Sequence, residues 1–283
     1  MLKTRQFIIL AFMVIALGSC SKYQTLIKKG TPEQKYKAAL KYYAKDDYYH
    51  AQQLLDELIV LYRGTNKLEK IYYMYAQTYY KQGEYIVASY HFKYFAKTFP
   101  KSKYAEESLF LSAYCKYLDS PPDNLDQTST KQAIRDMQMF INMYPDSPKV
   151  KEANKVMDEL RAKLVKKDFE NARQYLKTEY FRAAIYALKL HIKDYPASPY
   201  KEEALFLIEE ANFEYAEKSI FRKQKERYTA AVAAYNNYIA EYPDGKYKKQ
   251  AVKYMKTAQA RIHHIDRILA KRKQLSDRNK IKL

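Results

Sequence analysis

Residues 68–103 read LEKIYYMYAQTYYKQGEYIVASYHFKYFAKTFPKSK, and this stretch decides the fold. Its large apolar residues recur three and four positions apart, which predicts two amphipathic helices separated by a turn at Gly83-Glu84. Ala76 falls on the first helix and Ala88 on the second, and small residues at a helix crossing let two backbones approach closely. Pro100 then ends the unit, because proline cannot continue the helix behind it.

The same frame recurs along the chain. The alanine of the second helix has counterparts, each followed four residues later by a large residue. The pairs are Ala51 and Leu55, Ala88 and Phe92, Ala133 and Met137, Ala184 and Leu188, and Ala231 and Tyr235. A unit of about 34 residues with this pattern is typical of the tetratricopeptide repeat, in which helix pairs stack on one another. We therefore predict an all-α solenoid of five helix pairs plus a C-terminal capping helix from about Lys248 to Leu275.

Each unit is predicted to end with a helix stop followed by a helix start. Ser102, Ser147 and Ser198 follow the closing prolines, and we expect their hydroxyls to cap the next helix. Pro148 and Pro199 would then occupy the first helical position.

Three of the units are longer than the frame. The third unit carries an insertion at Ser120–Gln127. The first helix of the fourth unit extends through Leu164, and the fifth unit is extended by Phe221–Arg227 around a basic turn.

Residues 1–19 are typical of a targeting segment. Lys3 and Arg5 precede an 11-residue apolar run, Phe7–Leu17, which is too short to span a bilayer comfortably as a helix. The run ends in Leu17-Gly18-Ser19-Cys20, which resembles the bacterial lipoprotein signal. We therefore expect Cys20 to be acylated, since a thiolate is a strong nucleophile, with residues 20–32 as a lipidated tether. An ordinary secretory leader with an incidental cysteine is the alternative.

A lipid on Cys20 would anchor the protein without a transmembrane helix. By resemblance to sorted lipoproteins, the absence of Asp at position 21 favours the outer membrane, with the protein facing the periplasm. Cys115 is the other cysteine, and it would have no partner for an internal disulfide if Cys20 is acylated. It is predicted to be a small buried apolar residue.

The formal charge is +19, and the surplus is concentrated near the C-terminus, where residues 246–283 hold 13 Lys or Arg against two Asp. A charge block of this kind is usually a solvated face. The alternatives are contact with an acidic partner, anionic lipid head groups or nucleic acid, and export argues against nucleic acid. The candidate partner-binding residues are Arg261, Arg267, Lys271 and Arg272.

No catalytic or metal-binding pattern stands out. His263 and His264 are adjacent on a predicted helix and point about 100° apart, so they cannot hold one metal ion together. Only five glycines occur, and no glycine-rich phosphate loop is present. We expect no cofactor apart from the covalent lipid, and no enzymatic activity.

Several segments resemble the BamD family of outer-membrane protein assembly lipoproteins. They are the signal ending at Cys20, Glu33-Gln34-Lys35-Tyr36, Leu61-Tyr62-Arg63-Gly64-Thr65, Tyr79-Tyr80-Lys81-Gln82-Gly83-Glu84-Tyr85, Ser120-Pro121-Pro122 and Asp126-Gln127-Thr128. The resemblance implies a scaffold whose N-terminal repeats, residues 33–149, receive unfolded outer-membrane proteins. It also implies that the C-terminal repeats and capping helix, residues 150–275, grip the periplasmic domains of a BamA-like barrel subunit. The strongly basic last helix and the tail over 276–283 depart from the family.

A curved stack of helix pairs offers one concave face lined by first-helix side chains, which suits an extended peptide. The frame places six candidate substrate-binding residues there, Tyr36, Leu40, Tyr43, Tyr73, Gln77 and Tyr80. Their alternative role is to pack only against neighbouring helices. Two other functions stay open: a periplasmic repeat adaptor that organises peptidoglycan or cell-division enzymes, and a lipoprotein enzyme.

Overall fold

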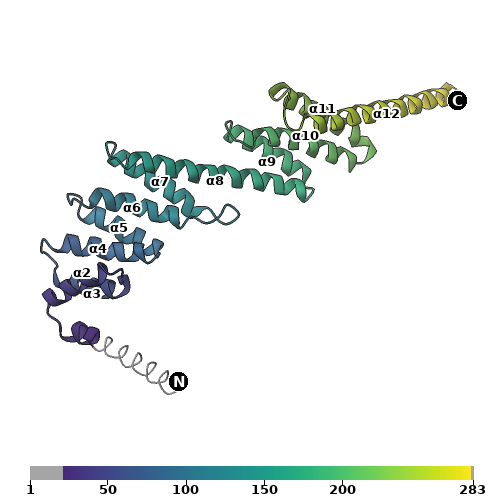
Figure 1. The fold of residues 1–283 in the computed structure, drawn as a ribbon. Helices are drawn as coiled ribbons and strands as arrows, with labels where there is room; N and C mark the ends of the chain where they lie inside the picture. The colour runs from purple at the N-terminus through teal and green to yellow at the C-terminus, as the bar shows by residue number, and fades with distance from the viewer. Residues whose placement is uncertain (1–21, 282–283) are drawn as a thin grey trace, which may run out of the picture. The chain divides into compact units, whose positions relative to one another are not determined.

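The computed structural model describes residues 22–281, and all regular secondary structure in that range is α-helical (Figure 1). The helix pairs are α2 (Pro32–Tyr43) with α3 (Tyr48–Leu61), α4 (Leu68–Lys81) with α5 (Tyr85–Thr98), α6 (Ala105–Leu118) with α7 (Thr128–Met143), α8 (Val150–Lys177) with α9 (Phe181–Asp194), and α10 (Lys201–Glu217) with α11 (Phe221–Glu241). The last helix is α12 (Lys248–Ile281). The predicted all-α repeat fold, with five pairs and a C-terminal helix, is confirmed.

The chain forms two compact parts, each larger than a single helix-pair repeat: residues 1–161, called unit 1, and residues 162–283, called unit 2. The division falls within α8. In unit 1 the described helix pairs stack in chain order (Figure 1). Each unit has its own buried clusters of apolar side chains.

The helix crossings are built as the repeat frame predicts. Ala76 and Ala88 are completely buried in one cluster with Phe92. The alanines equivalent to Ala88 are buried in every unit; they are Ala51, Ala133, Ala184 and Ala231. The fifth helix pair differs at the large residue that follows four positions after the alanine. Tyr235 stands there and is only half-buried, whereas the nearby Tyr238 is fully buried.

The turns within three pairs share one backbone conformation. Gly83 has φ +80°, and Asp46 and Glu179, its equivalents in the first and fourth units, have φ +59° and +62°. This left-handed region reverses the chain between the two helices, and glycine occupies it without steric penalty. The predicted turn at Gly83-Glu84 is therefore confirmed.

The turns between units differ from the expectation. Helices α6, α8 and α10 begin three residues after Ser102, Ser147 and Ser198, so these serines are not the N-caps. Each hydroxyl instead accepts the backbone N–H two residues further on, at 3.1–3.3 Å. The backbone between serine and helix is a tight turn, in which Ala105 N donates to Ser102 O at 2.9 Å. Pro148 and Pro199 lie inside these turns rather than at the first helical position.

The segment predicted as a tether is partly helical. Residues 22–29 form a helix that packs on the first pair, and Tyr23 is buried. Its hydroxyl donates to Gln53 Oε1 at 2.8 Å. Tyr23, Leu26 and Ile27 are spaced three and four residues apart, and this pattern explains the docking. Residues 20 and 21, including Cys20, lie outside the described range.

The three predicted extensions are all ordered. In the third-unit insertion, Gln127 is buried and donates to the carbonyl oxygens of Pro122 and Leu125 at 2.8 and 3.0 Å, so the Asp-Gln-Thr element folds the loop. Residues 221–227 form the first turns of α11 instead of a basic turn. Helix α12 continues to Ile281, beyond the predicted end at Leu275, because no proline or glycine interrupts it.

Candidate functional site

The first-helix face is the surface of unit 1 formed by α2, α4, α6 and the first turns of α8. Tyr73 of α4 lies half-buried at its centre. The Tyr73 hydroxyl donates to Glu107 Oε2 of α6 at 2.7 Å and accepts from Gln77 Nε2 at 2.6 Å. The Tyr73 ring stacks on Tyr104, with centroids 4.4 Å apart. Two of the predicted substrate residues thus form one hydrogen-bonded group.

The face continues onto helices for which the sequence analysis named no residues. Tyr117 of α6 donates to Glu159 Oε2 of α8 at 2.6 Å. Tyr80 of α4 is near enough to Tyr114 and Glu152 for their charges to influence its pKa. Burial raises the pKa of Tyr114, and the nearby charges of Glu152 and Glu159 raise it further. Tyrosines of α4 and α6 therefore lie beside carboxylates of α6 and α8.

The phenols of this face remain neutral through the physiological range. Burial is the largest cause that raises the pKa of Tyr43, Tyr73 and Tyr80. The hydrogen bond to Glu159 raises the pKa of Tyr117 to about 12. Neutral phenols with carboxylate neighbours can stack on aromatic side chains and can donate or accept hydrogen bonds. An extended peptide offers both kinds of partner.

The remaining candidates lie among other neighbours. Tyr43 contacts Tyr48, with centroids 5.4 Å apart, and the Glu107 carboxylate contributes to the raised pKa of Tyr43. Tyr36 lies against Tyr62 and under Lys67 Nζ, which is 5.5 Å from the ring centroid. Leu40 packs against the core of the first pair. Tyr36 and Leu40 thus pack against neighbouring side chains, and their role in substrate binding stays a prediction.

The four basic candidates on α12 fall into two kinds. Arg261 Nε pairs with Glu217 Oε1 at 3.3 Å, and the Arg272 guanidinium lies 5.3 Å from the Phe221 ring centroid. Arg267 and Lys271 are exposed. Two of the four therefore help to hold α12 on the other helices of unit 2.

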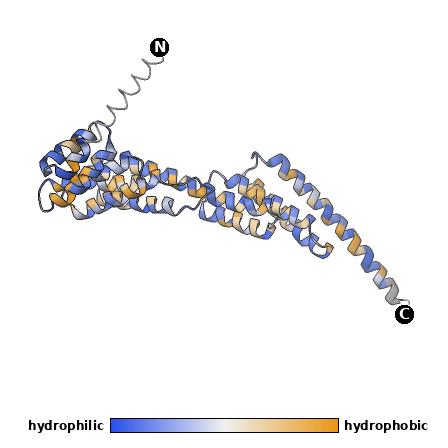
Figure 2. Ribbon diagram, turned by 90° about the horizontal axis from the view of Figure 1, so that it is seen from below, coloured by the Kyte–Doolittle hydropathy of each residue, from blue (hydrophilic) through white to orange (hydrophobic). Residues whose placement is uncertain are grey.

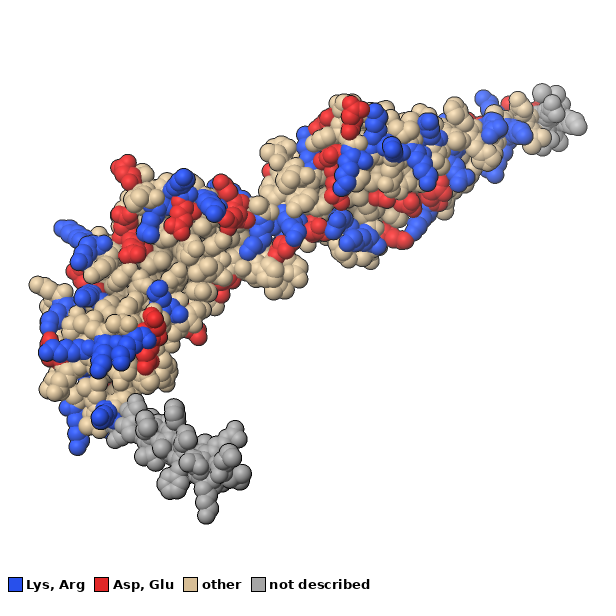
Figure 3. Space-filling view, in the orientation of Figure 1, with Lys and Arg blue, Asp and Glu red and all other residues tan. Residues whose placement is uncertain are grey.

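Helix α12 packs through a narrow seam. Its buried residues Ala251, Ala258 and Ile265 recur every seven positions, which keeps one stripe against its neighbours. Beyond the seam, apolar residues lie among polar ones along the helix (Figure 2), and Leu269 and Leu275 are exposed. Figure 3 shows lysine and arginine distributed along the same helix. This end of α12 is a basic surface with apolar side chains.

A polar cluster that the sequence analysis missed lies in unit 2. His191 is completely buried on α9, with Nδ1 2.7 Å from Asp168 Oδ2 and Nε2 2.9 Å from Ser198 Oγ. The order Asp, His, Ser matches a hydrolase triad. However, Ser198 Oγ also accepts the Tyr200 N–H at 3.1 Å, and the imidazole has no exposed surface. This arrangement fixes the turn between two units.

The fifth unit supports that structural role. The residue equivalent to His191 is Tyr238, and Tyr247 N donates to the Tyr238 hydroxyl at 3.1 Å, as Tyr200 N does to Ser198. The serine position is Gly245, where an added Cβ would lie 2.4 Å from the Tyr238 hydroxyl oxygen. One hydroxyl therefore serves each turn, supplied by serine in the fourth unit and by tyrosine in the fifth.

Two buried groups lie apart from these faces. Glu209 of α10 is completely buried, neither carboxylate oxygen has a hydrogen-bond partner within the described residues, and burial raises its pKa to about 8. Cys115 is completely buried, as predicted, and burial raises its pKa to about 12. Both are interior groups, inaccessible to a ligand.

The helices between residues 22 and 281 include none that is both long and apolar enough to cross a membrane. In the same range no three His, Cys, Asp or Glu side chains gather as a metal site would require.

Paired helices that stack in this way define a tetratricopeptide-type repeat solenoid. Residues 28–226 match the family model described as YfiO: Outer membrane lipoprotein. The chain belongs to this BamD-like family of outer membrane lipoproteins.

Two individual proteins are also similar. The outer membrane protein assembly factor BamD of Caulobacter vibrioides is 28% identical over 117 residues, which are 41% of this chain and 38% of that relative. The alignment thus spans well under two thirds of the relative. The crystal structure of the P58(IPK) TPR domain overlays with a TM-score of 0.39 at 14% identity, over 85% of this chain and 68% of that one. Such a TM-score does not establish a shared fold, so the repeat architecture rests on the helix pairs themselves.

Proposed function

We propose that this protein is a non-enzymatic scaffold in the assembly of outer-membrane β-barrel proteins, and that its first-helix face receives unfolded substrate chains. The proposal rests on membership of the lipoprotein family and on the name of the Caulobacter relative. The observation that carries the substrate role is the pairing of tyrosines with carboxylates of the next first helix, Tyr73 with Glu107 and Tyr117 with Glu159.

The chemistry of this face suits the strands of a β-barrel. Such strands alternate apolar side chains with polar ones, and many carry aromatic residues at the membrane interfaces. Rings such as Tyr73 and Tyr80 would stack on those aromatic residues, while Glu107 and Glu159 would accept the free backbone N–H groups of an unfolded strand. A half-exposed face without a closed pocket would let the strand leave again.

The partner surface is assigned to unit 2. Arg267 and Lys271, on the exposed side of α12, would meet acidic groups on the periplasmic domains of a BamA-like barrel subunit. Arg261 and Arg272 would contribute by holding α12 in place.

Attachment is assigned to a lipid on Cys20. Cys20 is two residues before the helix at 22–29, which packs on the first pair. Two residues span at most about 7 Å, so the acyl chains would hold the first pair against the membrane surface. Replacing Cys20 by Ala should leave an unprocessed or mislocalised precursor. Continued fractionation of Cys20→Ala with the outer membrane would refute the anchor.

Affinity purification from detergent-solubilised membranes tests the scaffold role. We expect a β-barrel subunit with periplasmic domains to copurify, and its absence would overturn the proposal. Depletion separates this function from the adaptor alternative. Loss of many outer-membrane proteins supports barrel assembly, whereas chaining or altered cell shape with normal porin levels supports an adaptor for peptidoglycan or division enzymes.

A further inference from the structure

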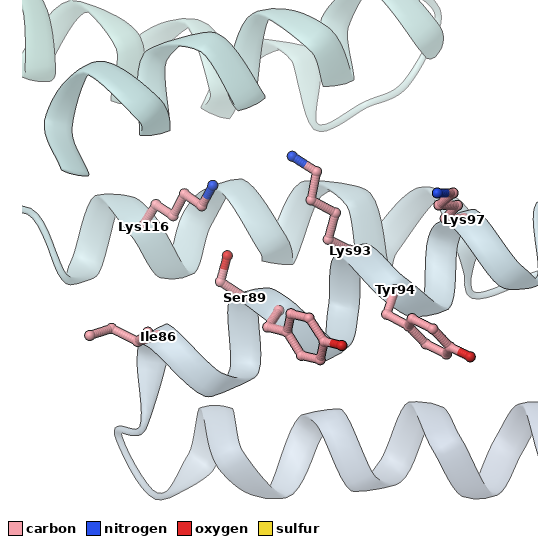
Figure 4. Close-up of a pocket in the computed structure, with 7 residues that line it drawn as sticks. Ile86, Ser89, Lys93, Tyr94, Lys97 and Lys116 are labelled. Atoms are coloured by element: carbon pink, nitrogen blue, oxygen red, sulfur yellow. The ribbon is translucent and has the colours of Figure 1, made fainter. Parts of the chain in front are cut away.

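Helix α5 carries a hollow on its exposed side that the proposed function leaves unused. Its volume is about 420 Å³, and it is lined by side chains of α5 and by Lys116 of α6 (Figure 4). The tyrosines and carboxylates of the first-helix face are not among the lining residues. We call this hollow the α5 groove.

One edge of the α5 groove is an apolar row. Ile86, Tyr90 and Tyr94 lie four residues apart and are 71%, 64% and 45% exposed. The Tyr94 ring stacks on Tyr72 of α4, with centroids 5.4 Å apart, which fixes that end of the row. At a rise of about 1.5 Å per residue, the three side chains are about 6 Å apart along the helix. Large apolar side chains exposed side by side mark an interaction surface.

The opposite edge is a row of ammonium groups from Lys93, Lys97 and Lys116 (Figure 4). A single carboxylate, that of Asp136, lies 3.2 Å from Lys93 Nζ and 2.6 Å from Lys116 Nζ. Lys93 and Lys116 therefore share one carboxylate, Lys97 has no ion-pair partner among the described residues, and the edge has surplus positive charge. Such an edge attracts a ligand that carries negative charge alongside its apolar groups.

The floor of the groove is closed. Ser89 is buried and its hydroxyl donates to Ser112 O at 2.8 Å, while the Ser112 hydroxyl donates to Ser89 O at 2.9 Å. Both hydroxyl groups are thus engaged in holding α5 on α6. Recognition must come from the two edges.

We infer that the α5 groove binds an acidic amphipathic helix of a partner protein. A helix lying along α5 presents side chains at the same spacing of three and four residues, so one of its faces can set apolar groups on the tyrosine row and carboxylates on the lysine row. The segments of this chain outside the described range, residues 1–21 and 282–283, contain Lys3, Arg5 and Lys282 but no Asp or Glu. A second copy is disfavoured by the charge of +19, and a flat lipid surface matches a hollow poorly.

Fluorescence anisotropy with a stapled 18-residue peptide (a length of about five helical turns) tests this inference. The peptide carries leucines four residues apart, flanked by glutamates. We expect saturable binding to the whole protein. The affinity of the peptide for each of the variants Lys97→Glu and Tyr90→Ser should be lower by a factor of about ten or more. A scrambled peptide of the same composition should not bind. Circular dichroism and urea midpoints verify that both variants fold.

The matched control is α9 of the fourth unit. Tyr186 and Lys193 of α9 are the equivalents of Tyr90 and Lys97 and are both exposed, but the residue equivalent to Lys116 is Asn212. Tyr186→Ser and Lys193→Glu should leave binding unchanged. Equal weakening by the α9 changes, equal binding of the scrambled peptide, or the same variant dependence with phosphatidylglycerol vesicles instead of the peptide would each overturn the inference. None of these results bears on substrate binding at the first-helix face.

Discussion

Units 1 and 2 share one backbone frame but bury different polar groups. The buried polar side chains of unit 1 are uncharged, such as Thr78, Ser112 and Gln127, apart from Lys35, which pairs with Glu57. Unit 2 completely buries the imidazole of His191 and the unpaired carboxyl group of Glu209. The frame therefore fixes the helix crossings without dictating interior chemistry. Stability should depend on pH mainly through unit 2.

The largest expected effect concerns Glu209. Burial raises its pKa from an ordinary 4.5 to about 8, so the folded state holds more protons than the unfolded state between these values. Unit 2 should therefore lose stability as pH rises from about 4.5 to 8, by roughly 4 kcal/mol, and little more above pH 8. Burial also raises the pKa of the adjacent Glu210, which acts in the same direction.

Glu209→Met tests this directly, because it keeps an unbranched side chain of similar size and removes the ionisation. We expect higher stability than the parent at pH 9 and a flatter pH dependence, measured as urea midpoints and as hydrogen exchange of α10. The control is Glu84→Gln in unit 1, at an exposed site. An undiminished pH dependence in Glu209→Met would show that another group is responsible.

The next effect concerns the two turns in unit 2 that use different hydroxyl groups. His191→Tyr with Ser198→Gly would rebuild the fourth turn with the pair found at Tyr238 and Gly245. Each single change should destabilise by about 1–3 kcal/mol, through a clash or a lost hydrogen bond. The double change should be less destabilising than the sum by about 1–2 kcal/mol in a double-mutant cycle. Strict additivity would mean that these positions are not interchangeable partners.

The smallest expected difference between the units is at the helix crossings. Ala88→Leu in unit 1 and Ala184→Leu in unit 2 both add three heavy atoms at a fully buried position. Each should destabilise by about 1–3 kcal/mol through overpacking. Urea denaturation of both variants measures the two losses side by side. An unchanged midpoint for either variant would contradict the common frame.

The sequence was sufficient to predict features that repeat. Ala51, Ala88 and Ala184 mark the crossings because every unit must bring its helices together in the same way. Tyr73 and Gln77 were placed together by the frame alone. The polar role of His191 was also accessible, since it falls where other units have Leu58, Phe95, Phe140 and Tyr238.

Features that depend on neighbours in space were beyond the frame. The hydrogen bond between Tyr117 and Glu159 joins two residues that are 42 positions apart in the sequence, and no spacing within one repeat encodes it. The α5 groove requires Lys116 of the next unit beside the exposed row on α5. The docking of residues 22–29 was missed because a short amphipathic segment resembles a polar linker until its partner surface is known.

Site-specific photocrosslinking in cells tests the central claim most directly. A photoreactive residue placed at Tyr80 or Tyr114 probes the first-helix face, and one at Tyr49, a 60% exposed tyrosine on α3, is the control. Newly made outer-membrane proteins should crosslink at positions 80 and 114 but not at 49. No crosslinks at 80 and 114, or equal crosslinking at all three positions, would contradict a substrate-binding face on unit 1.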